Sequence, residues 1–287
     1  MKGLTSGMRW ILRVASILVL IAGFQLFVLT DHTDRYFAWT IRPFLTAAFL
    51  GASYWASFVL VFQASREPFW AYARAGVFSA LTFTTLTTVA TALHLDKFHF
   101  ADPEPITLVA NWAWMIVYCF VPPILLILLI HQLRQTGGDP PRTLPLPIWI
   151  RSILFFQGLA MLGFGITFFI FPERAPSLWP WMLTPLTARV VGAWLLGMAV
   201  AAGGALKEND LARARGPIVC YAVLGFLQAI ALARYANFRS PDNGLPILHW
   251  DAAAAWIYLA FVLSVLLLGV GSSLYALFVF RQQRGTD

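Results

Sequence analysis

Residues 106–132 read ITLVANWAWMIVYCFVPPILLILLIHQ and contain no aspartate, glutamate, lysine or arginine. A helix rises about 1.5 Å per residue, so about 20 apolar residues cross the hydrocarbon core of a bilayer, which is about 30 Å thick. The stretch therefore predicts a transmembrane helix. Its Pro122-Pro123 pair is expected to bend or break that helix and to leave carbonyls that protein or water must cover.

Seven further uncharged, apolar runs predict seven more spans, at residues 14–30, 43–65, 75–95, 152–172, 190–206, 216–233 and 252–280. The run at 190–206 is short, and a helix of full length beginning near Thr184 must include Arg189. Hydrophobic residues make up 59% of the 287 residues and charged residues 11%, and the mean hydropathy is +0.72. This composition excludes a soluble enzyme, a disordered tail and a disulfide scaffold, and it predicts an all-α integral membrane protein.

The net charge of +7 and the pI near 9.8 would suggest a nucleic-acid partner in a soluble chain, but the basic residues lie singly between apolar runs. Of the 20 Lys and Arg residues, 13 lie in the two termini and in the loops on the same side of the membrane as the termini, and 7 lie in the loops on the other side. The positive-inside rule then places both termini in the cytoplasm. The basic first span lacks a small-residue cleavage site, so we expect an uncleaved helix. The expected surroundings are a lipid bilayer, with no nucleic acid.

Internal similarity predicts two repeats. Residues 51–94 match residues 192–235 at 11 of 44 positions, and the matches include the charged loop pairs Glu67 with Glu208 and Arg74 with Arg215. We expect one four-helix repeat at residues 1–135, a Pro/Gly-rich cytoplasmic linker at 136–147 and a second four-helix repeat at 148–287. An even number of spans returns the chain to its starting side, so the repeats are expected to be parallel rather than inverted.

The segment Trp179–Trp194, WPWMLTPLTARVVGAW, resembles a segment of multi-pass membrane proteins from bacteria such as actinomycetes. It covers 16 residues and continues loosely into the Lys207-Glu208 loop. The family has no activity that could be carried over. The resemblance implies a protein of the bacterial cytoplasmic (inner) membrane, and it draws attention to Arg189 within the segment.

Arg189 is the first candidate site residue because a charge within a span is expensive. If the helix already runs from Trp181, Arg189 lies about 12 Å along it. Its guanidinium would then pair with a carboxylate such as Asp251 or Glu173, hold a ligand anion, or snorkel to the interface. Arg42 and Arg234 approach the same side from other helix ends, and Arg suits phosphate or carboxylate. The predicted ligand-binding set is Arg189, Arg42, Arg234, His94 and Asp251.

Other patterns predict no cofactor and no metal site. His94 and His99 lack the spacing of a helical metal pair or a finger, and haem, phosphate-loop, serine-hydrolase and zinc-protease motifs are absent. The face shared by Thr84, Thr88 and Thr91 indicates helix packing, with a polar pathway lining as the alternative.

Three function classes remain open. The leading hypothesis is a transporter-like or solute-binding protein, whose outward-facing cleft between the repeats takes a small anionic or amphipathic molecule. The second is an integral-membrane enzyme for a lipid or polyprenyl substrate, with His94 or Asp251 as acid or base. The third is a non-catalytic subunit or assembly factor of a membrane complex.

Overall fold

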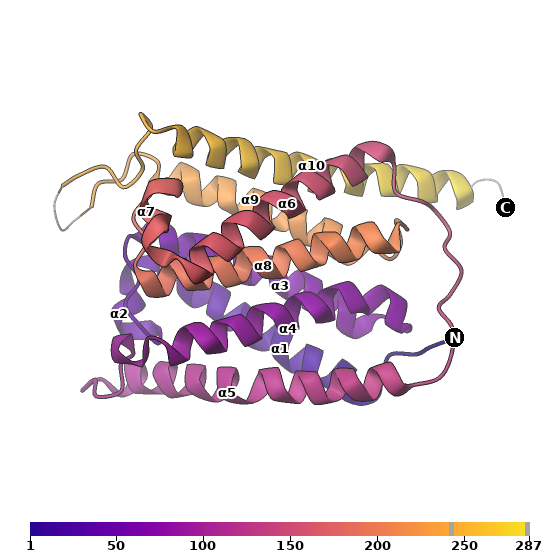
Figure 1. The fold of residues 1–287 in the computed structure, drawn as a ribbon, viewed down its shortest axis with the longest axis horizontal. Helices are drawn as coiled ribbons and strands as arrows, with labels where there is room; N and C mark the ends of the chain where they lie inside the picture. The colour runs from indigo at the N-terminus through magenta and orange to yellow at the C-terminus, as the bar shows by residue number, and fades with distance from the viewer. Residues whose placement is uncertain (241–243, 285–287) are drawn as a thin grey trace.

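The computed structural model describes residues 1–240 and 244–284, and this part of the chain is 76% helix with no strand. Eight described helices are long and apolar enough to cross a membrane, which confirms the predicted spans. They are α1 (Ser6–Phe27), α3 (Phe44–Arg66), α4 (Trp70–Ala92), α5 (Pro105–Arg134), α6 (Ile148–Ile170), α8 (Pro185–Glu208), α9 (Arg215–Tyr235) and α10 (Ala253–Arg284) (Figure 1).

Short helices fill some of the connections. They are η1 (Thr30–His32), α2 (Thr33–Tyr36), η2 (Leu95–Lys97), η3 (Pro172–Arg174) and α7 (Ala175–Leu178). The N-terminus, the 135–147 linker and the end of α10 lie at one end of the bundle, here called the linker end (Figure 1). The opposite end carries His32, His94, His99 and His249 and is called the histidine end.

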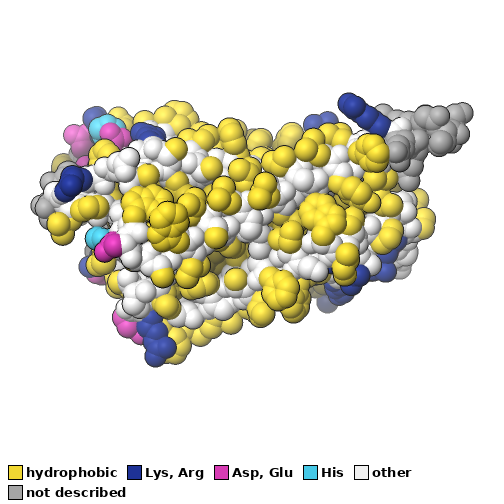
Figure 2. Space-filling model, turned by 90° about the horizontal axis from the view of Figure 1, so that it is seen from above, with side chains coloured by type: hydrophobic (Ala, Val, Ile, Leu, Met, Phe, Trp, Pro, Cys, Tyr) yellow, Lys and Arg dark blue, Asp and Glu magenta, His cyan; other side chains and the backbone are white. Residues whose placement is uncertain are grey.

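The surface between the two ends is mostly apolar. In Figure 2 the acidic side chains and histidines gather at the histidine end, at the left, whereas the coloured charges near the right-hand end are Lys and Arg. An apolar belt between two charged ends is the arrangement that a bilayer requires, because a charge in hydrocarbon is expensive.

Helices α3 and α8 form the centre of the bundle. In the most apolar 18 residues of α3, 83% of residues are buried, and in those of α8, 61% are. The corresponding share is 28% for each of α1, α5 and α6, which leave most of their surface for lipid. We call α1, α3, α4 and α5 the N-terminal set, and α6, α8, α9 and α10 the C-terminal set. The most extensive contacts pair α1 with α3, α6 with α8, α4 with α8, α9 with α10 and α3 with α9. The two sets therefore meet through the second and third helices of each.

The two sets contain the same local features about 142 positions apart. A 3-10 turn and a four-residue helix follow α1 and again follow α6. A Cβ at Gly51 would lie 2.4 Å from the Phe27 nitrogen of α1, and one at Gly192 would lie 2.9 Å from the Phe169 nitrogen of α6. Only glycine allows two helix backbones to cross so closely.

Aromatic rings form matching triangles at the histidine end. Phe37, Trp39 and Trp114 of the N-terminal set have centroids 4.8–5.3 Å apart. In the C-terminal set Trp179, Trp181 and Tyr258 lie 5.1–5.3 Å apart. Each triangle joins the segment after the first helix of its set to the last helix of that set.

Helix α5 runs without interruption through Pro122 and Pro123, so the alternative that the pair breaks the helix is wrong. Pro122 has no N–H, which leaves the carbonyl of Tyr118 without its helical partner. Thr88 of α4 supplies the missing donor, because its Oγ1 donates to that carbonyl at 2.7 Å. Thr91 accepts from the Trp114 indole at 3.1 Å. The threonine face of α4 thus packs against α5, as its spacing predicts.

Candidate functional site

Arg189 and His94 lie together at the histidine end. Arg189 belongs to the C-terminal set and His94 follows α4 of the N-terminal set, and the Arg189 Nη1 donates to His94 Nε2 at 2.6 Å. His94 must be neutral at Nε2 to accept this bond, which assigns its proton to Nδ1. Burial, and then the Arg189 charge, hold the pKa of His94 below its ordinary value. No described carboxylate forms an ion pair with Arg189.

Two starts were considered for the helix that contains Arg189, and the start near Thr184 is confirmed. Helix α8 begins at Pro185 rather than near Trp181, with Thr184 as the N-cap whose side chain accepts from the Thr187 N–H. Arg189 is therefore about 6 Å along the helix. This half-buried guanidinium lies near the end of the span.

Arg42 forms one wall of a cavity of about 330 Å³ at the histidine end. The cavity lies between the start of α3, the segment before α8 and the segment before α10. Its other lining residues are Pro43, Phe44, Met182, Thr184, Ser240, Leu245, Pro246, Ile247 and His249. The Arg42 guanidinium carbon lies 4.4 Å from the centroid of the Phe44 ring, and its Nη1 is buried with no hydrogen-bond partner among the described residues.

The remaining predicted residues lie elsewhere. Arg234 is exposed, donates to the Phe27 carbonyl at 3.1 Å and lies over the Tyr235 ring. Asp251 is exposed in the turn before α10 and makes no ion pair with a described residue. Among the five predicted residues, the structure places only Arg189 and His94 in direct contact. Their role in ligand binding stays a prediction.

A buried ion cluster at the linker end was missed at the sequence level. Arg74 of α4 donates from Nη2 to Glu208 of α8 at 2.7 Å and pairs with Asp139 of the linker at 2.8 Å. Arg213 donates to Glu208 at 2.8 Å and also to the Pro140 carbonyl. Glu208 and Arg213 are 2% and 3% exposed. We call Arg74, Asp139, Glu208 and Arg213 the linker-end cluster.

The linker packs onto the loop after α8 through a neighbouring carboxylate. Asp210 accepts from the backbone N–H groups of Thr143, Leu144 and Arg213 at 2.7–3.1 Å. Burial alone would raise the pKa of Asp210, but these bonds lower it below its ordinary value. The repeat alignment contained a signal for this region, because it matched Glu67 with Glu208 and Arg74 with Arg215 without showing which acid meets which base.

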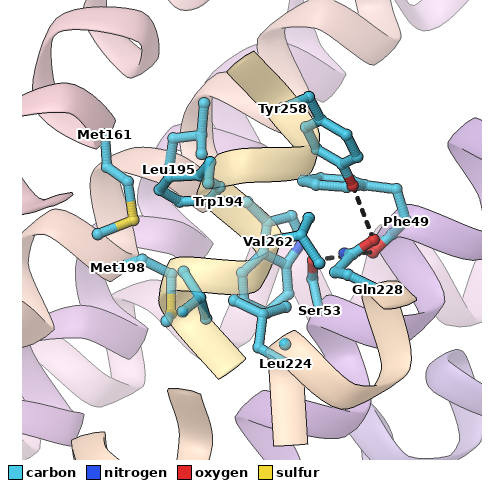
Figure 3. Close-up of a pocket in the computed structure, with 13 residues that line it drawn as sticks. Phe49, Ser53, Met161, Trp194, Leu195, Met198, Leu224, Gln228, Tyr258 and Val262 are labelled. Carbon is cyan, nitrogen blue, oxygen red and sulfur yellow. Dashed lines mark hydrogen bonds between the residues drawn. The ribbon is translucent and has the colours of Figure 1, made fainter. Parts of the chain in front are cut away.

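The C-terminal set, together with Phe49 and Ser53 of α3, encloses an apolar cavity of about 20 Å³, here called the inner cavity (Figure 3). Gln228 of α9 crosses it, donating to the Phe49 carbonyl at 3.0 Å and accepting from the Tyr258 hydroxyl at 3.0 Å. Trp194 of α8 lines it as well, and its indole Nε1 is buried with no described partner. No sequence pattern described above indicates this cavity.

No group of three or more His, Cys, Asp or Glu residues within the described ranges is arranged to hold a metal ion. Both cysteines are free, with Cys119 exposed and Cys220 buried. No family model, curated protein or solved structure matches the chain.

Proposed function

We propose that this polytopic membrane protein binds a small amphipathic anion in the Arg42 cavity, with the architecture of a transporter. The observation that carries the proposal is the buried Arg42 Nη1, which has no described partner at the wall of a 330 Å³ cavity. A buried guanidinium N–H group without an acceptor is costly, and a carboxylate, sulfonate or phosphate would supply one.

The other walls favour a ligand with an apolar part. Phe44, Met182 and Ile247 are among the apolar lining residues, whereas Thr184 and His249 offer hydrogen-bonding groups. Pockets for amphipathic molecules combine such walls with a few polar groups that fix orientation. The ligand is therefore an anionic head on a short apolar body.

The position of the cavity supports the same function. Arg42 and Phe44 come from the N-terminal set, and Met182, Thr184 and His249 come from the C-terminal set. We propose that the sets are parallel repeats at residues 1–135 and 148–287, joined by the linker at 136–147. The paired glycine crossings and aromatic triangles support this duplication. Transporters often bind substrate where repeats meet.

The distribution of Lys and Arg supports one orientation of the protein in the membrane. We propose a protein of a bacterial inner membrane, with both termini in the cytoplasm and the Arg42 cavity facing outward. The basic excess of the linker-end segments supports this orientation. An outward-facing cationic cavity would collect anions from outside the cell.

Binding can be tested in lipid nanodiscs with 11-(dansylamino)undecanoate and with its methyl ester as the uncharged probe. We expect saturable dansyl fluorescence with the acid, and an affinity about 10-fold lower in Arg42→Gln, because hydrogen bonds to charged groups contribute about 1.5–3 kcal/mol. The ester should bind Arg42→Gln and the unaltered protein alike.

Arg234→Gln is the matched control, because Arg234 lies at the same end outside this cavity and should leave both probes unaffected. Equal loss of affinity in the two variants, or equal binding of acid and ester to the unaltered protein, would refute a site at Arg42.

A further inference from the structure

A groove of about 100 Å³ lies between α6 and α10 at the apolar surface, next to the inner cavity. Groove and cavity share four lining residues, Met161, Leu195, Tyr258 and Phe261, so they lie side by side with these side chains between them. The groove residues that belong to α6 and α10 lie within the apolar belt. A molecule entering it would come from the lipid rather than from water.

The groove is bounded toward the linker end by a hydrogen bond between α6 and α10, and toward the histidine end by residues 178–180. Gln157 of α6 donates to the Ser264 hydroxyl of α10 at 2.8 Å, which ties the two helices together on the linker side. Leu178 and Ile257, on the groove wall, are 43% and 60% exposed. These exposed wall residues place the mouth of the groove at the side of the bundle, on its apolar surface.

Two indole N–H groups along this path lack acceptors. Trp179 lines the groove and Trp194 lines the inner cavity, and the Nε1 of each is buried with no described partner. Buried tryptophans usually find a hydrogen-bond partner, and an indole can only donate. The nearby polar groups already bond one another, since Ser53 donates to the Phe49 carbonyl at 2.8 Å and Gln228 bonds Phe49 and Tyr258. A molecule in this path would satisfy the two indoles by supplying acceptor atoms.

The lining restricts the molecule further. No charged side chain is among the described residues that line either space. The walls contain six aromatic rings, those of Phe49, Phe164, Trp179, Trp194, Tyr258 and Phe261. Aromatic walls favour a flat ring by offset or edge-to-face packing. An uncharged flat ring with two acceptor-only oxygens fits these restrictions.

We propose that the groove binds the ring of an isoprenoid quinone, whose two carbonyl oxygens accept hydrogen bonds from the Trp179 and Trp194 indoles. The inner cavity, at about 20 Å³, admits only the carbonyl edge, and the ring lies in the 100 Å³ groove. The prenyl tail leaves past Ile257 into the bilayer.

The N-terminal set provides an internal comparison. Its corresponding cavity, of about 60 Å³, is lined by Val19, Phe83 and Tyr118 and shares Trp194 as a wall. Phe37 stands 142 positions before Trp179 and has no N–H. Trp114, which occupies the place of Tyr258 in the aromatic triangle, already donates to Thr91 at 3.1 Å. In the N-terminal set the Trp39 indole Nε1 is also buried with no described partner, but Trp39 is not among the residues that line the 60 Å³ cavity.

The test uses nanodiscs of dioleoylphosphatidylcholine and a decyl-substituted benzoquinone labelled with ¹³C at its carbonyls. The unaltered protein should retain the quinone saturably, above its partition into empty nanodiscs, with the carbonyl stretch lowered by hydrogen bonding. Trp179→Phe and Trp194→Phe keep a ring and remove one donor each. Each should weaken binding about 3- to 10-fold and reverse part of the band shift.

Trp114→Phe is the matched control, because its indole has a partner within the protein, and it should change neither quantity. Ala160→Trp fills the groove from its exposed wall and should abolish retention without lowering the unfolding temperature, so the test stands even where Trp194→Phe fails to fold. Arg42→Gln should bind quinone normally, which separates this site from the Arg42 cavity.

The proposal is overturned by retention no greater than in empty nanodiscs. It is equally overturned by unchanged binding and band position in the double tryptophan variant. Displacement of the quinone by an equal concentration of diacylglycerol, with a shifted ester carbonyl band, would assign the groove to ester lipids instead.

Discussion

Arg74 and Glu208 form a bidentate ion pair between α4 and α8, 134 residues apart in sequence, at the linker end. Glu208 is 2% exposed, so its charge depends on Arg74 and Arg213 for compensation. Asp139 brings the linker to the same guanidinium. The pair thus joins the N-terminal set, the C-terminal set and the linker at one point.

Arg74→Ala should lower the free energy of unfolding by about 3 kcal/mol, because removing one partner leaves a buried charge uncompensated. Arg213 limits the loss by retaining one bond to Glu208. Unfolding can be followed in detergent by the reaction of buried Cys220 with a thiol-reactive dye, in a Cys119→Ser background.

Arg215→Ala is the control for this prediction. Arg215 corresponds to Arg74 in the alignment, but it is exposed and makes no ion pair with a described residue. It acts on Glu67 only from a distance, opposing the rise in the pKa of Glu67 that burial causes. Its loss should cost less than about 1 kcal/mol. Equal costs for the two variants would contradict a structural role for the Arg74–Glu208 pair.

Thr88→Val should destabilise the protein by about 1–3 kcal/mol, because the carbonyl of Tyr118 would then be buried without a donor. Thr82→Val is the matched change on the same helix. Thr82 is partly exposed and its hydroxyl bonds only the Phe78 carbonyl of its own helix, at 2.9 Å. A loss below about 0.5 kcal/mol is expected there. Similar unfolding temperatures for both variants would show that Thr88 does not support the proline pair.

His94 should make stability depend on pH. Its pKa in the folded protein lies below the ordinary value of 6.5, because of burial first and the Arg189 charge second. As the pH falls through 6.5, the unfolded chain takes up a proton before the folded one, and stability declines. We expect a smaller decline in His94→Gln, measured by thermal unfolding at pH 7.5 and 5.5.

Arg189→Gln provides a direct check, because removal of the guanidinium charge should raise the pKa of His94 toward 6.5. Histidine-selective NMR would measure this change. An unchanged His94 titration in Arg189→Gln would argue against the charge interaction.

Membrane orientation can be tested with Ser177→Cys in α7 and Thr136→Cys in the linker, both exposed positions. With both termini in the cytoplasm, a membrane-impermeant maleimide should label Ser177→Cys in intact bacterial cells and Thr136→Cys only after lysis. A Cys119→Ser background removes the exposed native thiol, and Cys220 is buried. The opposite labelling pattern would reverse the orientation and place the Arg42 cavity in the cytoplasm.

The sequence by itself predicted the eight spans, because spanning depends on the summed transfer free energy of about 20 neighbouring residues. It also predicted that Arg189 falls within a helix and that the threonine face of α4 packs. These properties are local, so they can be read without knowing which helices meet. The sequence left two starts open for α8, and the capping geometry at Thr184 and Pro185 decides between them and so sets the depth of Arg189.

Only the tertiary structure decided which distant side chains share a site. The contacts of Arg74 with Glu208, of Arg189 with His94 and of Thr88 with the Tyr118 carbonyl join separate helices or the ends of helices. The packing of the bundle likewise leaves the indole N–H groups of Trp179 and Trp194 without a described hydrogen-bond acceptor. Lipid can cover almost any apolar helix face, so hydropathy does not determine which helices lie next to one another. Close packing and polar pairing between helices determine it instead.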